Sequence, residues 1–104
     1  MAQIIWTQPA LSDLNDVANY IALDNFTAAE RLVRNVFAGV ERLEQFPDSG
    51  RIPPELQNSQ YREIIIEPCR IFYRKAQDKV YIVYLMRSER QLRKYIIDDR
   101  TQKK

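Results

Sequence analysis

The chain has 104 residues, of which 45% are hydrophobic and two are glycine, and this is typical of one folded domain spanning 1–104. It has no histidine and one cysteine, Cys69, so an internal disulfide and imidazole chemistry are excluded, and we expect neither metal nor cofactor. The strand-like context of Cys69 favours a buried thiol over a nucleophile. No apolar run is long enough to span a membrane and no signal peptide is evident at the start, so we expect a cytoplasmic protein.

The net charge of +2 is unevenly distributed. Residues 1–86 carry nine basic and eleven acidic side chains, whereas residues 87–104 carry seven basic and three acidic ones. A basic C-terminal segment docks on an acidic partner or on nucleic acid, or it is simply solvated, and composition alone leaves these alternatives open.

The first part of the chain predicts a strand followed by a helix. Gln3–Trp6 reads QIIW, a short apolar run suited to a strand. A helix over 9–23 is predicted next, with Thr7 as its N-cap and Asp13 near its N-terminus, where a carboxylate suits the helix dipole. Its apolar residues recur at helical spacing and form one stripe: Leu11, Leu14, Val17, Ala18 and Ile21.

A second, longer helix is predicted after residues 24–26. Residues 27–30, TAAE, form a capping box in which each polar side chain can satisfy the other's backbone donor, so we place the helix start at Thr27. An apolar rhythm of helical spacing continues to Leu43, and Pro47 ends it. The two amphipathic helices form a hairpin whose apolar stripes need a further surface to cover them.

That surface is predicted downstream. After a loop or single turn at 53–56, β-branched and aromatic residues over 62–66, 69–75 and 79–86 predict three strands. The short connections between them make the strands antiparallel. The predicted fold class is α+β: an N-terminal strand and a two-helix hairpin packed on one face of a mainly antiparallel, curved four-stranded sheet (βααβββ), with a basic C-terminal segment. The other face of the sheet is left available.

The connection between the second and third predicted strands decides which way three arginines point. With a two-residue turn, Arg62 pairs with Tyr73 and lies on the face opposite Arg70 and Arg74. If Cys69 joins the turn, Arg62 pairs with Arg74 and all three arginines share a face, because a one-residue shift reverses every side chain. We favour Arg70 and Arg74 on the open face and leave Arg62 undecided.

Seven short motifs occur in order along nearly the whole chain. They are W-T-x-x-A-L-x-D-L (6–14), A-x-Y-I-A (18–22), A-A-E-R (28–31), L-E-Q-F-P-D-S-G-R (43–51), P-E-L (54–56), Y-R-E (61–63) and C-R-I-F-Y-R (69–74). No single motif is specific, but their order and spacing resemble the RelE/ParE superfamily of toxins from bacterial type II toxin–antitoxin systems. Residues 43–51 and the Arg62-Glu63 pair resemble the ParE branch more than the RelE branch.

The resemblance implies one of two activities. ParE-like toxins poison DNA gyrase in its cleaved-DNA state and block replication, whereas RelE-like toxins are ribosome-dependent endoribonucleases that cut mRNA in the A site. Both kinds are neutralised by a cognate antitoxin, and operator DNA is bound only through the antitoxin complex. We expect gyrase inhibition, with mRNA cleavage as the alternative and an interaction domain without toxicity as a third hypothesis.

Gyrase inhibition needs a binding surface and no catalytic group. The resemblance implies that the C-terminal part matters for toxicity. The candidates for this role are Arg87, Arg90, Arg93, Lys94 and Tyr95. Apolar residues at 92, 95 and 96 fit an amphipathic turn or short helix, and docking back onto the domain explains them as well as partner contact does.

RNA cleavage would need a base, an acid and cations to stabilise charge on the phosphate. Arg70 and Arg87 stand where arginines of the family lie on the third and fourth strands, and Glu89 or Glu63 would have to act as the base. The lysines, the histidine and the tyrosine of RelE-like sites have no counterparts here, and arginine stays protonated. We therefore predict no catalytic residue.

Further arginines are candidates for contact with partners. The candidates for contact with nucleic acid or with the antitoxin are Arg62, Arg70 and Arg74. Arg31 and Arg34 are antitoxin-binding candidates, although pairing of Glu30 with Arg34 explains the latter equally simply. Formation of a homo-oligomer through an exposed sheet edge or helix face is left open.

Overall fold

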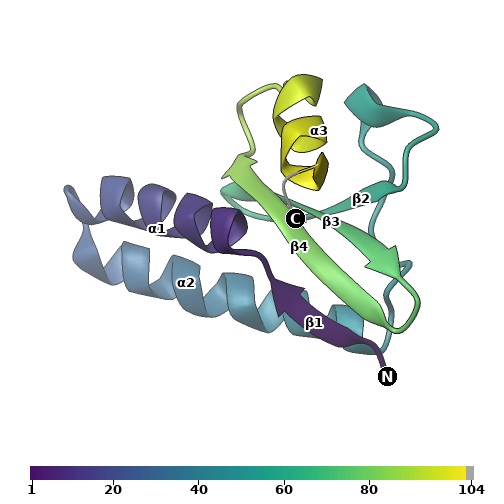
Figure 1. The fold of residues 1–104 in the computed structure, drawn as a ribbon. Helices are drawn as coiled ribbons and strands as arrows, with labels where there is room; N and C mark the ends of the chain where they lie inside the picture. The colour runs from purple at the N-terminus through teal and green to yellow at the C-terminus, as the bar shows by residue number, and fades with distance from the viewer. Residues whose placement is uncertain (103–104) are drawn as a thin grey trace.

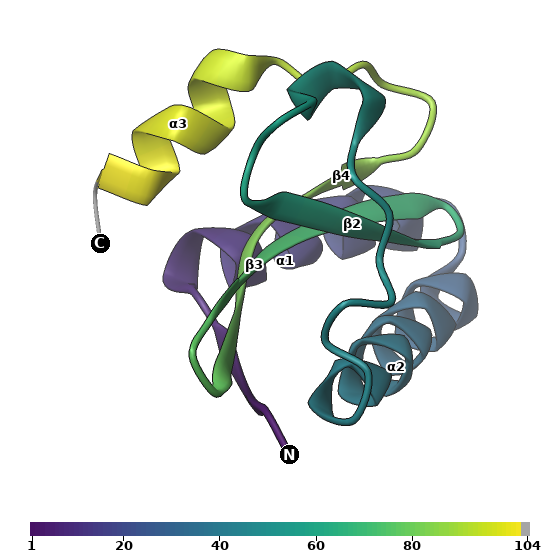
Figure 2. The ribbon, with the colours of Figure 1, turned by 90° about the vertical axis from the view of Figure 1, so that its right-hand side faces the viewer.

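The computed structural model describes residues 1–102, which form one four-stranded sheet with helices on both faces (Figures 1 and 2). In chain order the elements are β1 (Gln3–Trp6), α1 (Gln8–Ala22), α2 (Phe26–Glu41), η1 (Arg42–Glu44), η2 (Pro54–Leu56), β2 (Tyr61–Ile66), β3 (Cys69–Ala76), β4 (Lys79–Arg87) and α3 (Lys94–Gln102), where η marks a short 3-10 turn. The strands lie in the order β1-β4-β3-β2, with β1 parallel to β4 and the other neighbours antiparallel. This confirms the predicted α+β fold class and adds the helix α3. Lys103 and Lys104 of the basic segment lie outside the described residues.

Local capping explains where the first two helices begin. The Thr7 hydroxyl oxygen accepts a hydrogen bond from the Ala10 amide at 3.4 Å, as predicted for an N-cap. The predicted start of the second helix at Thr27 is wrong, because the Asn25 side chain caps the helix by accepting from the Ala28 amide at 3.0 Å. Asn25 is extended and α2 therefore begins at Phe26.

The turn between β2 and β3 has two residues, so Ile66 pairs directly with Cys69. In this register Arg62 pairs with Tyr73 and Arg74 pairs with Tyr61. Successive side chains of a strand point to opposite faces, so Arg62 lies on the face opposite Arg70 and Arg74. The alternative in which all three arginines share a face is wrong.

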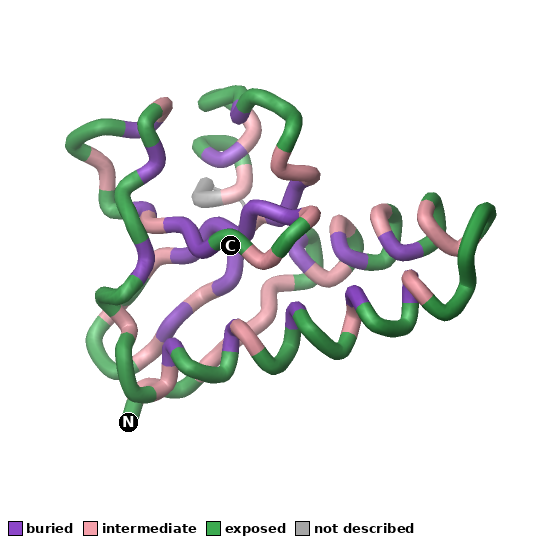
Figure 3. Tube along the Cα trace, turned by 180° about the vertical axis from the view of Figure 1, so that it is seen from behind, coloured by how far each residue is buried: buried purple, intermediate pink, exposed green. Residues whose placement is uncertain are grey.

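The α1–α2 hairpin covers one face of the sheet with an apolar core. In Figure 3 the buried positions of both helices recur on their inner side, while the loop that joins them is exposed and projects past the sheet. The helix α2 approaches β2 closely at Gly39, where an added Cβ would lie 2.2 Å from the Cδ1 atom of Ile66. The buried core residues on this face include Leu14, Leu32, Val36, Val40, Leu43, Ile64, Ile71, Tyr73 and Ile82.

The opposite face of the sheet is covered as well, so the expectation of an available face is wrong. The turn η2 and the C-terminal segment close over it, and Leu92 and Ile97 are buried there. The apolar cluster comprises Leu56, Tyr61, Phe72, Val83, Met86, Leu92 and Ile97. Tyr95, by contrast, is 65% exposed, so the segment docks through residues 92 and 97 instead of through the predicted apolar residue 95. None of the helices within residues 1–102 is long and apolar enough to cross a membrane.

Candidate interaction site

Arg70 on β3 lies in a buried cluster of charges between the sheet and the turn η2. Its side chain is 7% exposed, and its Nε and Nη2 atoms donate to Glu63 at 2.7 and 3.1 Å. Its Nη1 and Nη2 atoms also donate to Glu55 at 2.9 and 2.8 Å. Glu63 is fully buried and accepts a further hydrogen bond from the Nε atom of Arg51 at 2.8 Å. Arg70 is thus neutralised inside the molecule and presents no free guanidinium at the surface.

The pKa values of the cluster follow from these contacts. The hydrogen bond from Arg70 lowers the pKa of Glu55 from 4.5 to about 2, against a smaller opposing effect of burial. The hydrogen bond with Glu55 in turn raises the pKa of Arg70 above its ordinary value. Glu55 also accepts from the amide of Leu92 at 3.2 Å, so the cluster fastens the segment that leads into α3.

Arg62 and Arg74 lie on different faces of the sheet and do not form one site. The Nη1 atom of Arg62 donates to the Gly50 carbonyl at 2.8 Å, which holds the loop before β2. The guanidinium of Arg74 lies 4.4 Å from the centre of the Tyr81 ring, at a distance suited to a cation–π contact. Contact of Arg62 and Arg74 with nucleic acid or with the antitoxin stays a prediction. The same holds for Arg70, whose ion pairs with Glu55 and Glu63 would first have to break.

Arg31 and Arg34 are exposed on α2. Neither forms an ion pair within residues 1–102, so the predicted pairing of Glu30 with Arg34 is not part of the structure. Their role in antitoxin binding stays a prediction.

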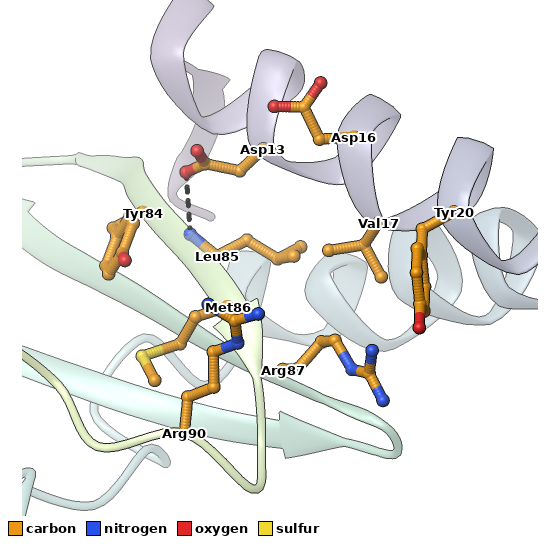
Figure 4. A pocket seen from close by; sticks show the side chains of 9 residues that line it. All are labelled: Asp13, Asp16, Val17, Tyr20, Tyr84, Leu85, Met86, Arg87 and Arg90. Atoms are coloured by element: carbon orange, nitrogen blue, oxygen red, sulfur yellow. Dashed lines mark hydrogen bonds between the residues drawn. The ribbon is translucent and has the colours of Figure 1, made fainter.

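A cavity opens between α1 and the end of β4 (Figure 4). We call it the α1–β4 wedge, and its volume is about 370 Å³. It is lined by Asp13, Asp16, Val17, Tyr20, Tyr84, Leu85, Met86, Arg87 and Arg90. Apolar and aromatic side chains thus meet both carboxylates and guanidinium groups there. Two of the predicted toxicity candidates, Arg87 and Arg90, belong to this cavity.

The two arginines of the wedge differ in their surroundings. The Nε atom of Arg87 lies 2.6 Å from Glu89, and its guanidinium lies 5.2 Å from the centre of the Tyr20 ring. Arg90 is exposed and lines both the wedge and a second cavity of about 700 Å³ beside Leu92 and Arg93. In Figure 4 the two guanidinium groups are both on the wedge but reach it from different directions.

Asp13 and Arg100 form a second charged contact, which joins three elements. The carboxylate of Asp13 on α1 accepts a hydrogen bond from the amide of Leu85 on β4 at 3.0 Å. It also accepts two hydrogen bonds from Arg100 on α3: Nη2 donates to Oδ1 at 2.9 Å, and Nη1 donates to Oδ2. The Nη1 atom of Arg100 also donates to the Val83 carbonyl at 3.1 Å. The guanidinium of Arg100 lies 4.5 Å from the centre of the Tyr84 ring. The carboxylate of Asp13 raises the pKa of Arg100.

Sequence reasoning missed this contact. It assigned Asp13 only to the helix dipole and gave no role to Arg100, which is 87 positions away. No local pattern could have connected the two. Glu55 was likewise noted only within the P-E-L motif.

The remaining toxicity candidates lie on or next to α3. Arg93, Lys94 and Tyr95 are all exposed. Together with Arg90 they form a basic and aromatic surface at the start of α3, and the Arg70 cluster fastens this surface through Leu92.

The structure separates the two arginines that a nuclease would need together. Arg70 pairs with Met86 across the strands, and Cys69 pairs with Arg87, so Arg70 and Arg87 point to opposite faces of the sheet. Each is also bound to a carboxylate. Cys69 is buried, and burial raises the pKa of its thiol to about 11, so it is a poor nucleophile.

The fold is that of a RelE/ParE-like toxin domain. A solved structure described as a chromosomal ParDE toxin–antitoxin system from P. aeruginosa superposes with a TM-score of 0.70, covering 84% of this chain and 96% of that chain at 23% identity. The family model for the ParE toxin of the type II toxin–antitoxin system parDE matches residues 4–92. The chain therefore belongs to this family of toxins.

Two relatives are similar to this chain over most of its length. Toxin RelE2 of Caulobacter vibrioides is 31% identical over 91 residues, which is 86% of this chain and 99% of that protein. Putative toxin Y4kP of Sinorhizobium fredii is 34% identical over 91 residues, which is 86% of this chain and 91% of that protein. Membership of the family implies a cognate antitoxin as a protein partner.

Proposed function

We propose that this protein is a toxin that inhibits DNA gyrase by binding, without a catalytic step of its own, and that its antitoxin relieves the inhibition. The separation of Arg70 and Arg87 to opposite faces of the sheet is the observation that carries the proposal. An RNA-cleaving site needs cations that converge on one phosphate. Two arginines that are separated by the sheet and already bound to carboxylates do not converge in this way.

The surface at the start of α3 is the candidate contact with gyrase. Four side chains are exposed to solvent there, namely those of Arg90, Arg93, Lys94 and Tyr95. Leu92 is buried in the apolar cluster beneath and anchors the segment. Arginine and tyrosine are enriched at binding surfaces, and a backbone that is already anchored loses little conformational freedom on contact.

Gyrase supercoiling in the presence of the purified protein tests the proposal. We expect loss of supercoiling and accumulation of linear DNA, which marks a trapped double-strand break. The variant Arg90→Ala/Arg93→Ala should lose most of this inhibition. The variant Arg31→Ala/Arg34→Ala removes the same charge from exposed positions on α2 and serves as the matched control that keeps it.

The alternative activity, mRNA cleavage, is tested in parallel by primer extension on translating ribosomes. Cuts in the A site together with unaffected gyrase would overturn the proposal in favour of a ribonuclease, the activity that we associate with the RelE branch. Inactivity in both assays, together with normal growth on expression, would leave an interaction domain without toxicity.

A further inference from the structure

Two stacked aromatic rings connect the Arg70 cluster with the Asp13–Arg100 contact. We call them the aromatic pair: Phe72 on β3 pairs directly with Tyr84 on β4, and the ring centres are 5.7 Å apart at an interplanar angle of 22°. Phe72 is fully buried in the apolar cluster under α3, and Tyr84 packs against that cluster. Stacked rings attract each other and favour a defined relative orientation, so a shift of one ring affects the other.

A guanidinium group lies close to each ring of the aromatic pair. That of Arg70 is 5.0 Å from the centre of the Phe72 ring, and that of Arg100 is 4.5 Å from the centre of the Tyr84 ring. Both distances suit a cation–π contact. Each guanidinium is also bound by at least one carboxylate that comes from a different element. A continuous chain of contacts therefore runs from the turn η2 through the sheet to α3 and α1.

A bulge in β4 produces this arrangement. The register of β4 against β3 shifts after the Phe72–Tyr84 pair. The next pair along uses Ile82, so Val83 is skipped in the ladder between the two strands. A bulge of this kind redirects the side chains next to it. The Val83 carbonyl accepts from Arg100 at 3.1 Å, so Arg100 binds both a ring and a backbone acceptor at the bulge.

Both ends of this chain of contacts hold the segment 92–100. At one end Glu55, which also binds Arg70, accepts from the amide of Leu92 at 3.2 Å. At the other end Arg100 is itself part of α3. Loss of the contact at one end removes the support of one ring, and this weakens the stack and the cation–π contact at the other end. The two ends therefore stabilise each other.

We propose that the aromatic pair couples the Arg70 cluster to the Asp13–Arg100 contact and thereby acts as a positioning element for α3. The segment 92–100, with the exposed basic residues at its start, is then held cooperatively instead of by two independent contacts. Asp13 and Tyr84 also line the α1–β4 wedge, so this cavity and the basic surface are connected through the same residues. The coupling is a property of the fold and does not depend on gyrase inhibition.

A double-mutant cycle measured by urea denaturation tests the coupling. Asp13→Asn and Glu63→Gln each remove a carboxylate charge at one end and keep an oxygen that can accept. We expect the two together to raise the unfolding equilibrium constant by about fivefold less than the product of their single effects, as for residues in one network. Asp48→Asn is the control, because Asp48 pairs only with side chains outside this chain of contacts. Its effect should multiply with that of Asp13→Asn to within about twofold.

Substitutions of Tyr84 identify the route of the coupling. Tyr84→Phe keeps the ring and should keep the fivefold coupling, whereas Tyr84→Leu removes the ring, keeps an apolar side chain and should reduce the coupling to less than about twofold. Additive effects of Asp13→Asn and Glu63→Gln with Tyr84 intact would overturn the proposal, since the two ends would then act independently. An undiminished coupling in the Tyr84→Leu background would also overturn it, because the coupling would then run along the segment 92–100.

Hydrogen exchange gives a second measurement that needs only one variant. In Asp13→Asn the amide of Leu92, which Glu55 holds at the far end, should exchange about fivefold faster than in the unmodified protein. The Ile71 amide in the hairpin-face core should be slower than the Leu92 amide in both proteins, so the change reports a local opening. An unchanged rate at Leu92 would contradict the coupling, because an independent Arg70 cluster would keep holding this amide.

Discussion

The two faces of the sheet are closed by different kinds of contact. The face under the α1–α2 hairpin is covered by a large apolar core, in which Ile71 is fully buried. The face under α3 has a smaller apolar cluster around Ile97, and a charged contact lies at each end of it. At one end Arg70 binds two carboxylates, and at the other Asp13 binds Arg100.

The two kinds of contact contribute differently to the stability of the fold and to the position of α3. Apolar burial is strong but non-directional, so it holds the hairpin to the sheet without requiring one exact arrangement of side chains. A buried ion pair adds little net stability, yet it is costly to break on one side and it permits few geometries. We infer that the hairpin face supplies most of the free energy of folding. The charged contacts of Arg70 and Arg100 instead fix the position of α3 and of the exposed basic residues at its start.

The largest effect is expected from truncation of the hairpin-face core. Ile71→Ala should lower the free energy of unfolding by about 4 kcal/mol, because the residue is fully buried in the larger core and its truncation leaves a cavity. Ile97→Ala should cost only about 2 kcal/mol, since α3 can shift to fill the space. Urea denaturation of both variants measures the difference. Equal losses would remove the proposed contrast between the two faces.

The next effect is expected from the buried carboxylate of the Arg70 cluster. Glu63→Ala should cost about 3 kcal/mol, because it leaves Arg70 buried with only one of its two carboxylates. The double variant Glu63→Leu/Arg70→Met should recover most of this loss, since it removes both charges and fills the space with apolar groups. A double variant as unstable as Glu63→Ala would show that the charges stabilise the fold as well as position α3.

A smaller effect is expected at the other end of α3. Asp13→Ala removes the partner of Arg100 and leaves the Leu85 amide without an acceptor, so it should cost about 2 kcal/mol. Hydrogen exchange should also speed up in 94–100 before it does in the sheet. Asp16→Ala on the exposed side of the same helix is the control, with an expected change within about 0.5 kcal/mol. Faster exchange throughout the sheet would contradict a local role.

The smallest effect depends on pH and concerns Glu55. Because its pKa is lowered from 4.5 to about 2 in the folded protein, the ionised carboxylate stabilises the fold above pH 4.5, and this contribution is lost as the pH falls toward 2. The full pKa shift corresponds to about 3 kcal/mol, but the glutamine oxygen can still accept from Arg70, so Glu55→Gln should be less stable than the unmodified protein by only about 1 kcal/mol at pH 7. The gap should close between pH 4.5 and 2. Urea titrations at several pH values measure it, and a gap that stays constant would exclude the ionised carboxylate as its cause.

Much of the fold was predictable because its signals are local. Helical periodicity predicted α1 and most of α2, and the order of strands and short turns predicted the antiparallel part of the sheet. The boundary of α2 was missed by one residue because two neighbouring polar residues, Asn25 and Thr27, both suit a cap, and the structure uses Asn25. The sequence did not decide whether the C-terminal segment docks on its own domain or contacts a partner, because one short apolar pattern fits both equally well.

The sequence by itself determined the fold class and the family, because periodicity, caps and motif spacing are properties of neighbouring residues. Only the tertiary structure decided how the arginines are used. It placed Arg70 and Arg87 on opposite faces of the sheet. It also joined Asp13 on α1 to Arg100 on α3. The physical reason is that the register of a strand and the pairing of distant charges depend on which segments pack on each face of the sheet. These contacts cannot be predicted from the local sequence.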